Sequence, residues 1–264
     1  MNFHARLAAR SRAAGSLLCV GLDPAFSRHR VEDVAAYNRE IIQATAPYAA
    51  CFKPNLAFYE QWGVPGLRAL EETMAAIPAC IPVIGDAKRG DIGSTAEAYA
   101  RAMFETWGFD AVTLNAYLGR DSVEPFLEYD DRGLYLLCRT SNPGATDLQY
   151  LKLEAGPLLF EHLAAMVTGW SPNIGLVVGA TAPGELRRVR AIAPRASLLV
   201  PGVGAQGGLP ADVIAAAGSE PGSIVVNASR SIYYAAEGPG FAEAAASAAR
   251  KLRDELAAAA TPAA

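Results

Sequence analysis

Short apolar runs recur along the chain with a spacing of roughly 20 to 40 residues, which is the period of a strand followed by a helix. The runs are nearly continuous in Val, Ile, Leu, Ala and Cys, and most of them end in Gly, Pro or a polar residue. Runs of this length and composition predict strands that are buried on both faces. The eight predicted strands are 17–23, 50–55, 82–88, 111–116, 134–140, 174–181, 197–204 and 223–229.

The stretches between these runs are rich in Ala, Leu, Glu and Arg, and their apolar residues recur at helical spacing. The predicted helices are an amphipathic first helix within 1–15, then 31–46, 67–76, 94–107, 157–168, 183–193 and 241–256. The interval 209–222 admits either an ordinary helix or a mobile lid, and we expect the helix. The Ala-rich tail 257–264 is expected to fray.

Alternation of strands and helices requires a parallel sheet that is covered by helices. Eight repeats favour closure, so the sequence predicts an α/β fold in which residues 1–264 form a single-domain (β/α)8 TIM barrel. A doubly wound open sheet is the alternative. That fold would call for a Gly-rich dinucleotide fingerprint after the first strand, where the sequence reads GLDPAF at 21–26.

Composition narrows the class of protein. With 52% hydrophobic and 19% charged residues, the chain can bury a large core. The net charge of −4 and the lack of a Lys/Arg run argue against a nucleic-acid partner. No apolar stretch reaches the roughly 18 residues that a membrane span needs. Residues 1–15 are compatible with a targeting peptide, but Asp23 and Pro24 interrupt the apolar run that follows, so we expect a cytoplasmic protein.

Cysteine and histidine positions do not predict a metal site. The four cysteines lie in or beside apolar segments and lack CxxC spacing, which is typical of reduced core residues: Cys19, Cys51, Cys80 and Cys138. The three histidines are far apart in sequence and lack metal-motif spacing: His4, His29 and His162. We therefore expect no metal.

Polar residues gather where the predicted strands end. In a barrel of this kind the active site lies at the carboxyl ends of the strands. The strand-end residues are Asp23, Lys53, Asn55, Asp86, Lys88, Asn115, Ser141 and Asn142. Asp86 and Lys88 are two residues apart on the third strand and should point to the same side of it. Asp91 follows in a turn that Gly90 and Gly93 allow to bend tightly.

Lys53, Asp86, Lys88 and Asp91 carry alternating charges, which lets each charge have neighbours of opposite sign when the group is buried. Such a group is either a catalytic centre or a salt-bridge network that stabilises the barrel. A phosphate site favours the catalytic interpretation. It is indicated by the Gly-rich loop 201–208, with Gln206, and by Arg230 after the last strand, because barrels often bind phosphate with these two loops.

The segment DAKRGDI at 86–92 resembles the DxKxxDI signature of the orotidine 5′-phosphate decarboxylase family. The resemblance extends over almost the whole chain through five further segments: GLDP at 21–24, FKPN at 52–55, TSNPGA at 140–145, PGVGAQGG at 201–208 and NASRSIYYA at 227–235. The wording of 52–60 and 114–119 is similar to the longer branch of the family common in mycobacteria and related bacteria. Residues 227–230 read NASR where many relatives have VGRG, so the local backbone there is expected to differ.

The resemblance implies decarboxylation of orotidine 5′-monophosphate (OMP) to UMP, the last step of pyrimidine biosynthesis, without a cofactor. Asp86 would lie against the substrate carboxylate and stay ionised between Lys53 and Lys88. Lys88 would stabilise a carbanion at C6 of the pyrimidine and then protonate it, while Lys53 would hold Asp86 and the ribose.

The remaining implied contacts concern substrate binding. Asp91 and Thr95 would reach the ribose of a neighbouring subunit's substrate, with Ile92 packed beside them, which implies a homodimer with shared sites. The other implied substrate-binding residues are Asp23 at the ribose, Ser141 at the pyrimidine, Pro201 at the wall near the base, Gln206 and Arg230 at the phosphate, Gly207, and Asn115, whose role is open.

Two other functions fit the same residues. A sugar-phosphate decarboxylase or aldolase related to 3-keto-gulonate 6-phosphate decarboxylase shares the barrel and a DxKxxD motif but uses magnesium. The GLDP, TSNPGA and Gln206 features disfavour it. A non-catalytic barrel that senses UMP is the second alternative, since a fold does not dictate a function.

Overall fold

The computed structural model describes residues 1–154, 156–204 and 207–261. Within them, eight parallel strands form one sheet in the order β2-β1-β8-β7-β6-β5-β4-β3. Isolated parallel bridges join Phe52 to Val83 and Asn55 to Asp86, so β2 meets β3 and the barrel closes. The strands are β1 Leu18–Leu22, β2 Cys51–Pro54, β3 Ile84–Arg89, β4 Ala111–Leu114, β5 Gly133–Arg139, β6 Ile174–Val178, β7 Leu198–Pro201 and β8 Ile224–Ala228. The predicted barrel is confirmed, and the open sheet is excluded.

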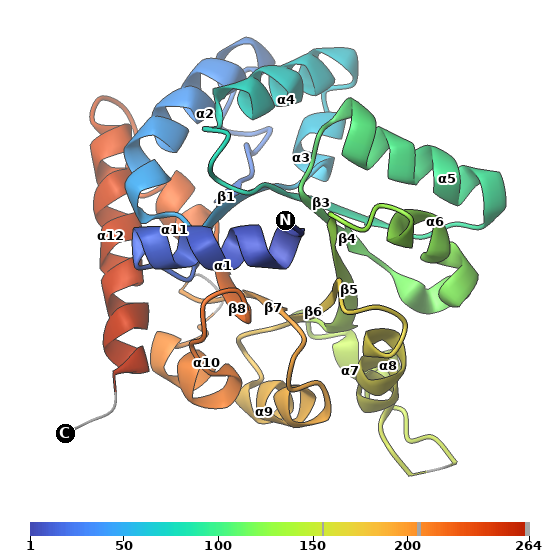
Figure 1. Cartoon of the computed structure of the whole chain (residues 1–264). Coiled ribbons are helices and arrows are strands. Elements are labelled where there is room, and N and C mark those ends of the chain that lie inside the picture. Colours follow the sequence, from blue (N-terminus) through green and yellow to red (C-terminus); the bar gives the residue numbers. More distant parts are fainter. Residues whose placement is uncertain (155, 205–206, 262–264) are drawn as a thin grey trace.

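Helices surround the barrel, as Figure 1 shows. They are α1 Phe3–Ala14, α2 Val31–Thr45, α3 Ala57–Glu60, α4 Val64–Ala76, α5 Gly93–Arg101, α6 Glu124–Leu127, α7 Ala145–Leu148, α8 Leu159–Thr168, α9 Pro183–Ile192, α10 Pro210–Ala217, α11 Arg230–Tyr233 and α12 Phe241–Ala260. Short 3-10 turns at Ala46–Tyr48, Ala116–Leu118 and Arg120–Ser122 and a π-helical segment at Ala102–Thr106 complete the described elements. In the part of the chain that the structure describes, no helix is long and apolar enough to cross a membrane.

The structure corrects the prediction for the C-terminal tail and decides between the two alternatives for the interval 209–222. Four residues of the tail expected to fray, 257–260, continue α12 in helical form. Alanine has the highest intrinsic helix propensity, and Ala259 and Ala260 pack partly buried against the core. Within the interval 209–222, Pro210–Ala217 form the ordinary helix α10, as expected.

The amino-terminal helix closes one end of the barrel. Asn2 caps α1 by accepting a hydrogen bond from the Ala5 N–H at 3.0 Å, and Gly15 ends it in the left-handed conformation with φ 56°. Phe3 and Leu7 are fully buried and join the side chains that fill the barrel interior. Burial of each such side chain stabilises the fold by about 1.5–3 kcal/mol. Figure 1 shows α1 lying across this end of the barrel.

The opposite end of the barrel, where the strands terminate, carries the loops. The loop after β3 packs closely against the loop after β4. A Cβ atom at Gly90 would lie only 2.4 Å from the carbonyl oxygen of Asn115, so the two backbones leave no room for a side chain there. A hydrogen bond of 2.8 Å from the Asn115 N–H to the Arg89 carbonyl oxygen joins the same two loops. The turn that carries Asp91 is therefore fixed to its neighbour.

Candidate active site

A cavity of about 640 Å³ opens at the carboxyl ends of the strands. Nine of the strand-end and substrate-binding residues predicted from the sequence line it: Asp23, Lys53, Asn55, Asp86, Lys88, Ser141, Asn142, Pro201 and Arg230. These residues come from the ends of β1, β2, β3 and β7 and from the segments that follow β5 and β8. The convergence expected from the barrel geometry is present.

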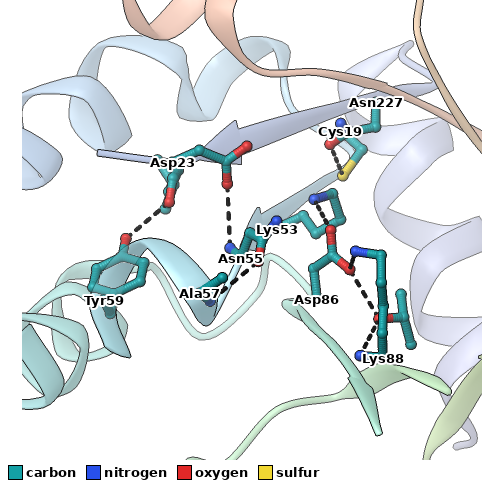
Figure 2. Close-up of polar contacts among 11 residues, drawn as sticks. Cys19, Asp23, Lys53, Asn55, Ala57, Tyr59, Asp86, Lys88 and Asn227 are labelled. Carbon is teal, nitrogen blue, oxygen red and sulfur yellow. Dashed lines mark hydrogen bonds and ion pairs between the residues drawn. The ribbon is translucent and has the colours of Figure 1, made fainter. Parts of the chain in front are cut away.

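Asp86 is the centre of a charged triad on the floor of this pocket (Figure 2). Its Oδ2 accepts a hydrogen bond of 2.7 Å from Lys53 Nζ, and its Oδ1 accepts one of 2.5 Å from Lys88 Nζ. The two lysines differ in exposure: the Lys53 side chain is 4% exposed, whereas the Lys88 side chain is 47% exposed. One cation is therefore fixed in the protein, and the other faces the space where a ligand would bind.

The electrostatics of the triad keep its carboxylate charged. Burial on its own would raise the pKa of Asp86, but the charges of Lys53 and then Lys88 hold that pKa well below its usual range. Burial likewise opposes the charged form of Lys53, but the charge of Asp86 raises the pKa of Lys53 above its ordinary value. Both shifts favour the ionised form of the group at neutral pH.

Thr113 supports the triad from the neighbouring strand β4. Its hydroxyl donates to Asp86 Oδ1 at 2.9 Å and accepts a hydrogen bond of 3.0 Å from the Lys88 N–H. A single side chain therefore contacts both the carboxylate and the backbone of the exposed lysine. Thr113 was not among the predicted site residues, although its hydroxyl interrupts the otherwise apolar run 111–114.

The backbone around Lys88 differs from the regular strand that was predicted. Between Gly85 and Arg89, β3 advances four residues while β4 advances two, from Val112 to Leu114, so the strand is bulged there. Lys88 has φ 50° and is the one non-glycine residue with positive φ in the described part of the chain. This left-handed backbone costs about 1–3 kcal/mol and is typical of functional sites. The expected regular alternation is wrong, but Asp86 and Lys88 still meet.

Asp23 lies at the end of β1, and its position is fixed from several directions. Its Oδ1 accepts a hydrogen bond of 3.2 Å from the Asn55 N–H, and the carbonyl oxygen of the preceding Leu22 accepts one of 2.9 Å from the Tyr59 hydroxyl (Figure 2). On the other side, the Ala25 N–H donates to the Tyr234 hydroxyl at 2.6 Å. The carboxylate is thus presented to the pocket by a rigid loop.

The phosphate site predicted from the sequence falls partly within the described residues. Arg230 lines the pocket, and the Ser229 hydroxyl beside it is buried without a hydrogen-bond partner among the described residues. Gln206, predicted to bind phosphate, lies outside the described residues. Gly207 occupies an exposed turn with φ 88° and does not line the described pocket.

Four other predicted residues lie outside the pocket wall. Asp91, Ile92 and Thr95 are on the surface beside the mouth, where Asp91 Oδ1 accepts a hydrogen bond of 2.8 Å from the Ile92 N–H. Asn115 Oδ1 accepts one of 3.1 Å from the Tyr117 N–H and caps the turn that follows β4. The structure therefore gives Asn115 a local structural contact rather than a place in the pocket.

Several lining residues were not among the predicted binding residues. Asn227 lies on β8 and Tyr234 follows α11. Gln149 and Thr140 also line the pocket and bind each other through two hydrogen bonds, of 2.9 Å and 2.7 Å, that hold the loop after β5 against the wall. Within the described residues, no three His, Cys, Asp or Glu side chains gather in a way that could hold a metal ion.

Comparison with known proteins adds independent findings. The model of the "Orotidine 5′-phosphate decarboxylase / HUMPS family" matches residues 16–246. A relative from Thermomicrobium roseum named orotidine 5′-phosphate decarboxylase is 48% identical over 267 residues, which cover 97% of this chain and 95% of the relative. One of the same name from Herpetosiphon aurantiacus is 48% identical over 252 residues, covering 92% and 93% of the two chains. The structure of Leishmania donovani OMP decarboxylase aligns with a TM-score of 0.88 and 40% identity, covering 98% of this chain and 99% of that one.

Proposed function

This chain belongs to the orotidine 5′-phosphate decarboxylase family and is a carboxy-lyase that converts OMP to UMP and CO2, and we propose that the triad of Lys53, Asp86 and Lys88 performs this reaction. The observation that carries the mechanism is the position of the Asp86 carboxylate between one buried and one exposed lysine. A network that served only the barrel would not need to present a lysine to an open cavity.

Asp86 acts on the ground state of the substrate. With the OMP carboxylate bound beside it, two negative charges about 4 Å apart repel each other by roughly 4 kcal/mol at an effective dielectric constant of about 20. The charge of Lys53 keeps Asp86 ionised while the substrate is bound, because burial and the ion pair with Asp86 hold the Lys53 side chain in place. Loss of CO2 removes the repulsion, so this term favours the transition state over the bound substrate.

Lys88 stabilises and then protonates the carbanion that bond cleavage leaves at C6. The bond between C6 and the carboxylate carbon breaks, CO2 leaves, and the electron pair stays on C6. The ammonium of Lys88 stabilises this negative charge and then donates a proton to C6, which yields UMP and a neutral lysine. Because its side chain is 47% exposed, Lys88 can regain a proton from solvent after product release.

The remaining pocket residues bind the nucleotide and hold it in register with the triad. Asp23 accepts hydrogen bonds from the ribose, Ser141 contacts the pyrimidine, and Pro201 forms the wall near the base. Arg230 binds the phosphate, where its charged fork fits phosphate oxygens. These remote contacts supply binding energy for the strained arrangement at the carboxylate. Every reacting group comes from the chain itself, so we propose that no metal or organic cofactor takes part.

We further propose a homodimer in which each site is completed by its partner. Ile92 is 57% exposed, and the apolar side chains of Tyr117 and Leu118 are also exposed, after the adjoining strand β4. Exposed apolar side chains grouped beside polar residues are typical of interaction sites. Asp91 and Thr95 lie on the same surface, from which they would reach the ribose in the partner's pocket.

Two further parts of the proposal concern the whole chain. All four cysteines are free, three of them buried and Cys80 exposed, which agrees with a reducing compartment such as the cytoplasm. We also propose that residues 1–264 act as a single decarboxylase domain, because one large cluster of buried side chains links the barrel to the helices around it.

The experiment that tests this function is the ultraviolet absorbance of OMP mixed with the purified protein in buffer that contains EDTA. Loss of OMP absorbance with UMP as product is the expected result. No loss of OMP, together with Mg²⁺-dependent decarboxylation of a keto-sugar phosphate, would favour the sugar-phosphate branch of the same family. A folded protein that binds UMP without turnover would identify a nucleotide sensor instead.

A further inference from the structure

Asn227 is a buried amide at the base of the active-site pocket. It is the one polar residue of β8, and it is 8% exposed. Burial of an amide at such a position is unfavourable when it lacks hydrogen-bond partners. Its presence in the barrel interior therefore requires a partner for each of its polar atoms.

The oxygen of this amide has a partner in the protein. The Cys19 thiol on β1 donates a hydrogen bond of 3.4 Å to Asn227 Oδ1, as Figure 2 shows. The two residues are register partners in the parallel pair of β1 and β8, and Cys19 is fully buried. The thiol therefore sets the orientation of the amide and turns the amide nitrogen away from itself.

The nitrogen of the amide makes no hydrogen bond to another described residue, and Asn227 lines the pocket. Asn38 provides a contrast inside the same molecule. Its Nδ2 donates to the Tyr59 hydroxyl at 3.0 Å and to the Thr73 hydroxyl at 2.8 Å, and its Oδ1 accepts from the Tyr233 hydroxyl. The fold satisfies Asn38 completely but leaves the two N–H groups of Asn227 open at the pocket.

The depth of Asn227 indicates which part of a nucleotide it meets. Ser229 and Arg230, the residues expected near the phosphate, follow it by two and three positions. β8 ends at Ala228 and Ser229 follows it, so Asn227 lies deeper in the barrel than Ser229. Asn227 is the register partner of Pro201 on β7, the residue expected at the wall near the base, so we expect it to meet the ribose or base and not the phosphate.

We propose that Asn227 donates a hydrogen bond from Nδ2 to an uncharged oxygen of the bound nucleotide, a ribose hydroxyl or a pyrimidine carbonyl, and that Cys19 is the positioning residue that orients it. The inference rests on the proposed function, since it assumes that a pyrimidine nucleotide fills the pocket. Substrate and product share these oxygens, so the contact lowers KM and the Kd of UMP and leaves kcat within about twofold.

The test combines binding with a spectroscopic signature. In protein labelled with 15N, the side-chain amide signals of Asn227 are identified by their loss in Asn227→Leu, which keeps the size of the side chain. We expect them to shift when UMP is added and to stay in place with inorganic phosphate, while the signals of Asn38 do not move. A shift with ribose 5-phosphate as well would place the contact on the ribose, and a shift with UMP alone would place it on the base.

Substitutions at Asn227 and Cys19 provide a second test of the inference. Asn227→Leu should raise the Kd of UMP and the KM of OMP by roughly 3- to 10-fold, as expected for one lost hydrogen bond. Cys19→Ala should weaken binding in the same direction but less, and Cys19→Ser, which keeps a donor, should restore it. If UMP leaves the Asn227 signals unshifted, or if Asn227→Leu binds UMP as the wild type does, the inference is wrong even though the wild type turns over. A wild type that binds no nucleotide would remove the proposed function along with it.

Discussion

Replacing Lys53 with methionine tests the energetics of the triad directly. Lys53→Met keeps the buried stem of the side chain and removes the charge that lies 2.7 Å from Asp86 Oδ2. Breaking a buried ion pair on one side costs about 3–5 kcal/mol, because the remaining charge is left without compensation. Lys88 still pairs with Asp86, so we expect the low end of this range, about 3 kcal/mol, and a fall in Tm of about 6 to 12 °C.

The assay is urea unfolding at pH 7, with Lys251→Met as a matched control. Lys251 pairs with Glu255 on the exposed face of α12, and loss of that pair should change the free energy of unfolding by no more than about 0.5 kcal/mol. The double variant Lys53→Met with Asp86→Asn should recover part of the loss, since no buried charge remains alone. If Lys53→Met were as stable as the control, the buried pair would not have the role described.

The pH dependence of the free energy of unfolding tests the same ion pair, because the account predicts the direction of the change. The folded pKa of Asp86 is lowered, so the stability that its ionisation contributes is present above the unfolded value of about 4 and is lost as pH falls toward the folded value. The deficit of Lys53→Met relative to the wild type should therefore be full at pH 7 and should shrink below about pH 4. A deficit that grows in acid would contradict the assignment.

Three further outcomes are expected. Asp86→Asn should lower kcat/KM for OMP by about 100-fold or more in the absorbance assay, while UMP, which lacks the carboxylate, still binds; wild-type turnover would exclude ground-state repulsion. Burial lowers the pKa of His4, so urea unfolding should show stability rising from mildly acidic pH toward pH 7.5, with a smaller slope in His4→Gln; equal slopes would rule out His4 as a contributor. Ile92→Glu should shift the protein from dimer to monomer in sedimentation and remove most turnover; an unchanged sedimentation coefficient would refute the proposed interface.

The fold was predictable because its signal is repeated along the whole chain. Each βα unit contributes one apolar run and one helical stretch, so an error at any single boundary leaves the count and the closure unchanged. The boundaries themselves were less certain. The end of α12 was placed too early because an Ala-rich tail has no periodic apolar pattern, although alanine is the strongest helix former.

The candidate site was predictable where charge interrupts an apolar strand. Lys53, Asp86 and Lys88 are conspicuous on that ground, and barrel geometry brings strand ends together. The bulge in β3 was not visible in the sequence, because left-handed lysine has no sequence signature of its own. Neutral polar residues such as Thr113 and Asn227 were missed because they resemble ordinary core positions when only the pattern is considered.

Some of the predicted contacts depend on a second chain. Asp91, Ile92 and Thr95 lie on the surface of this chain, so their predicted place at a substrate is reached only if a partner supplies the pocket. Asn115 shows the opposite case. A polar residue at a strand end is also what a turn needs for its own cap, and the sequence does not distinguish the two uses.

Turnover and UMP binding of Lys88→Ala test the central claim most directly. The variant removes the exposed ammonium of the triad and leaves Lys53, Asp86 and the phosphate contacts in place. We expect no measurable conversion of OMP, with the Kd of UMP within about tenfold of the wild-type value, and full activity in the exposed control Lys251→Ala. Conversion of OMP by Lys88→Ala at the wild-type rate would contradict the proposed protonation at C6.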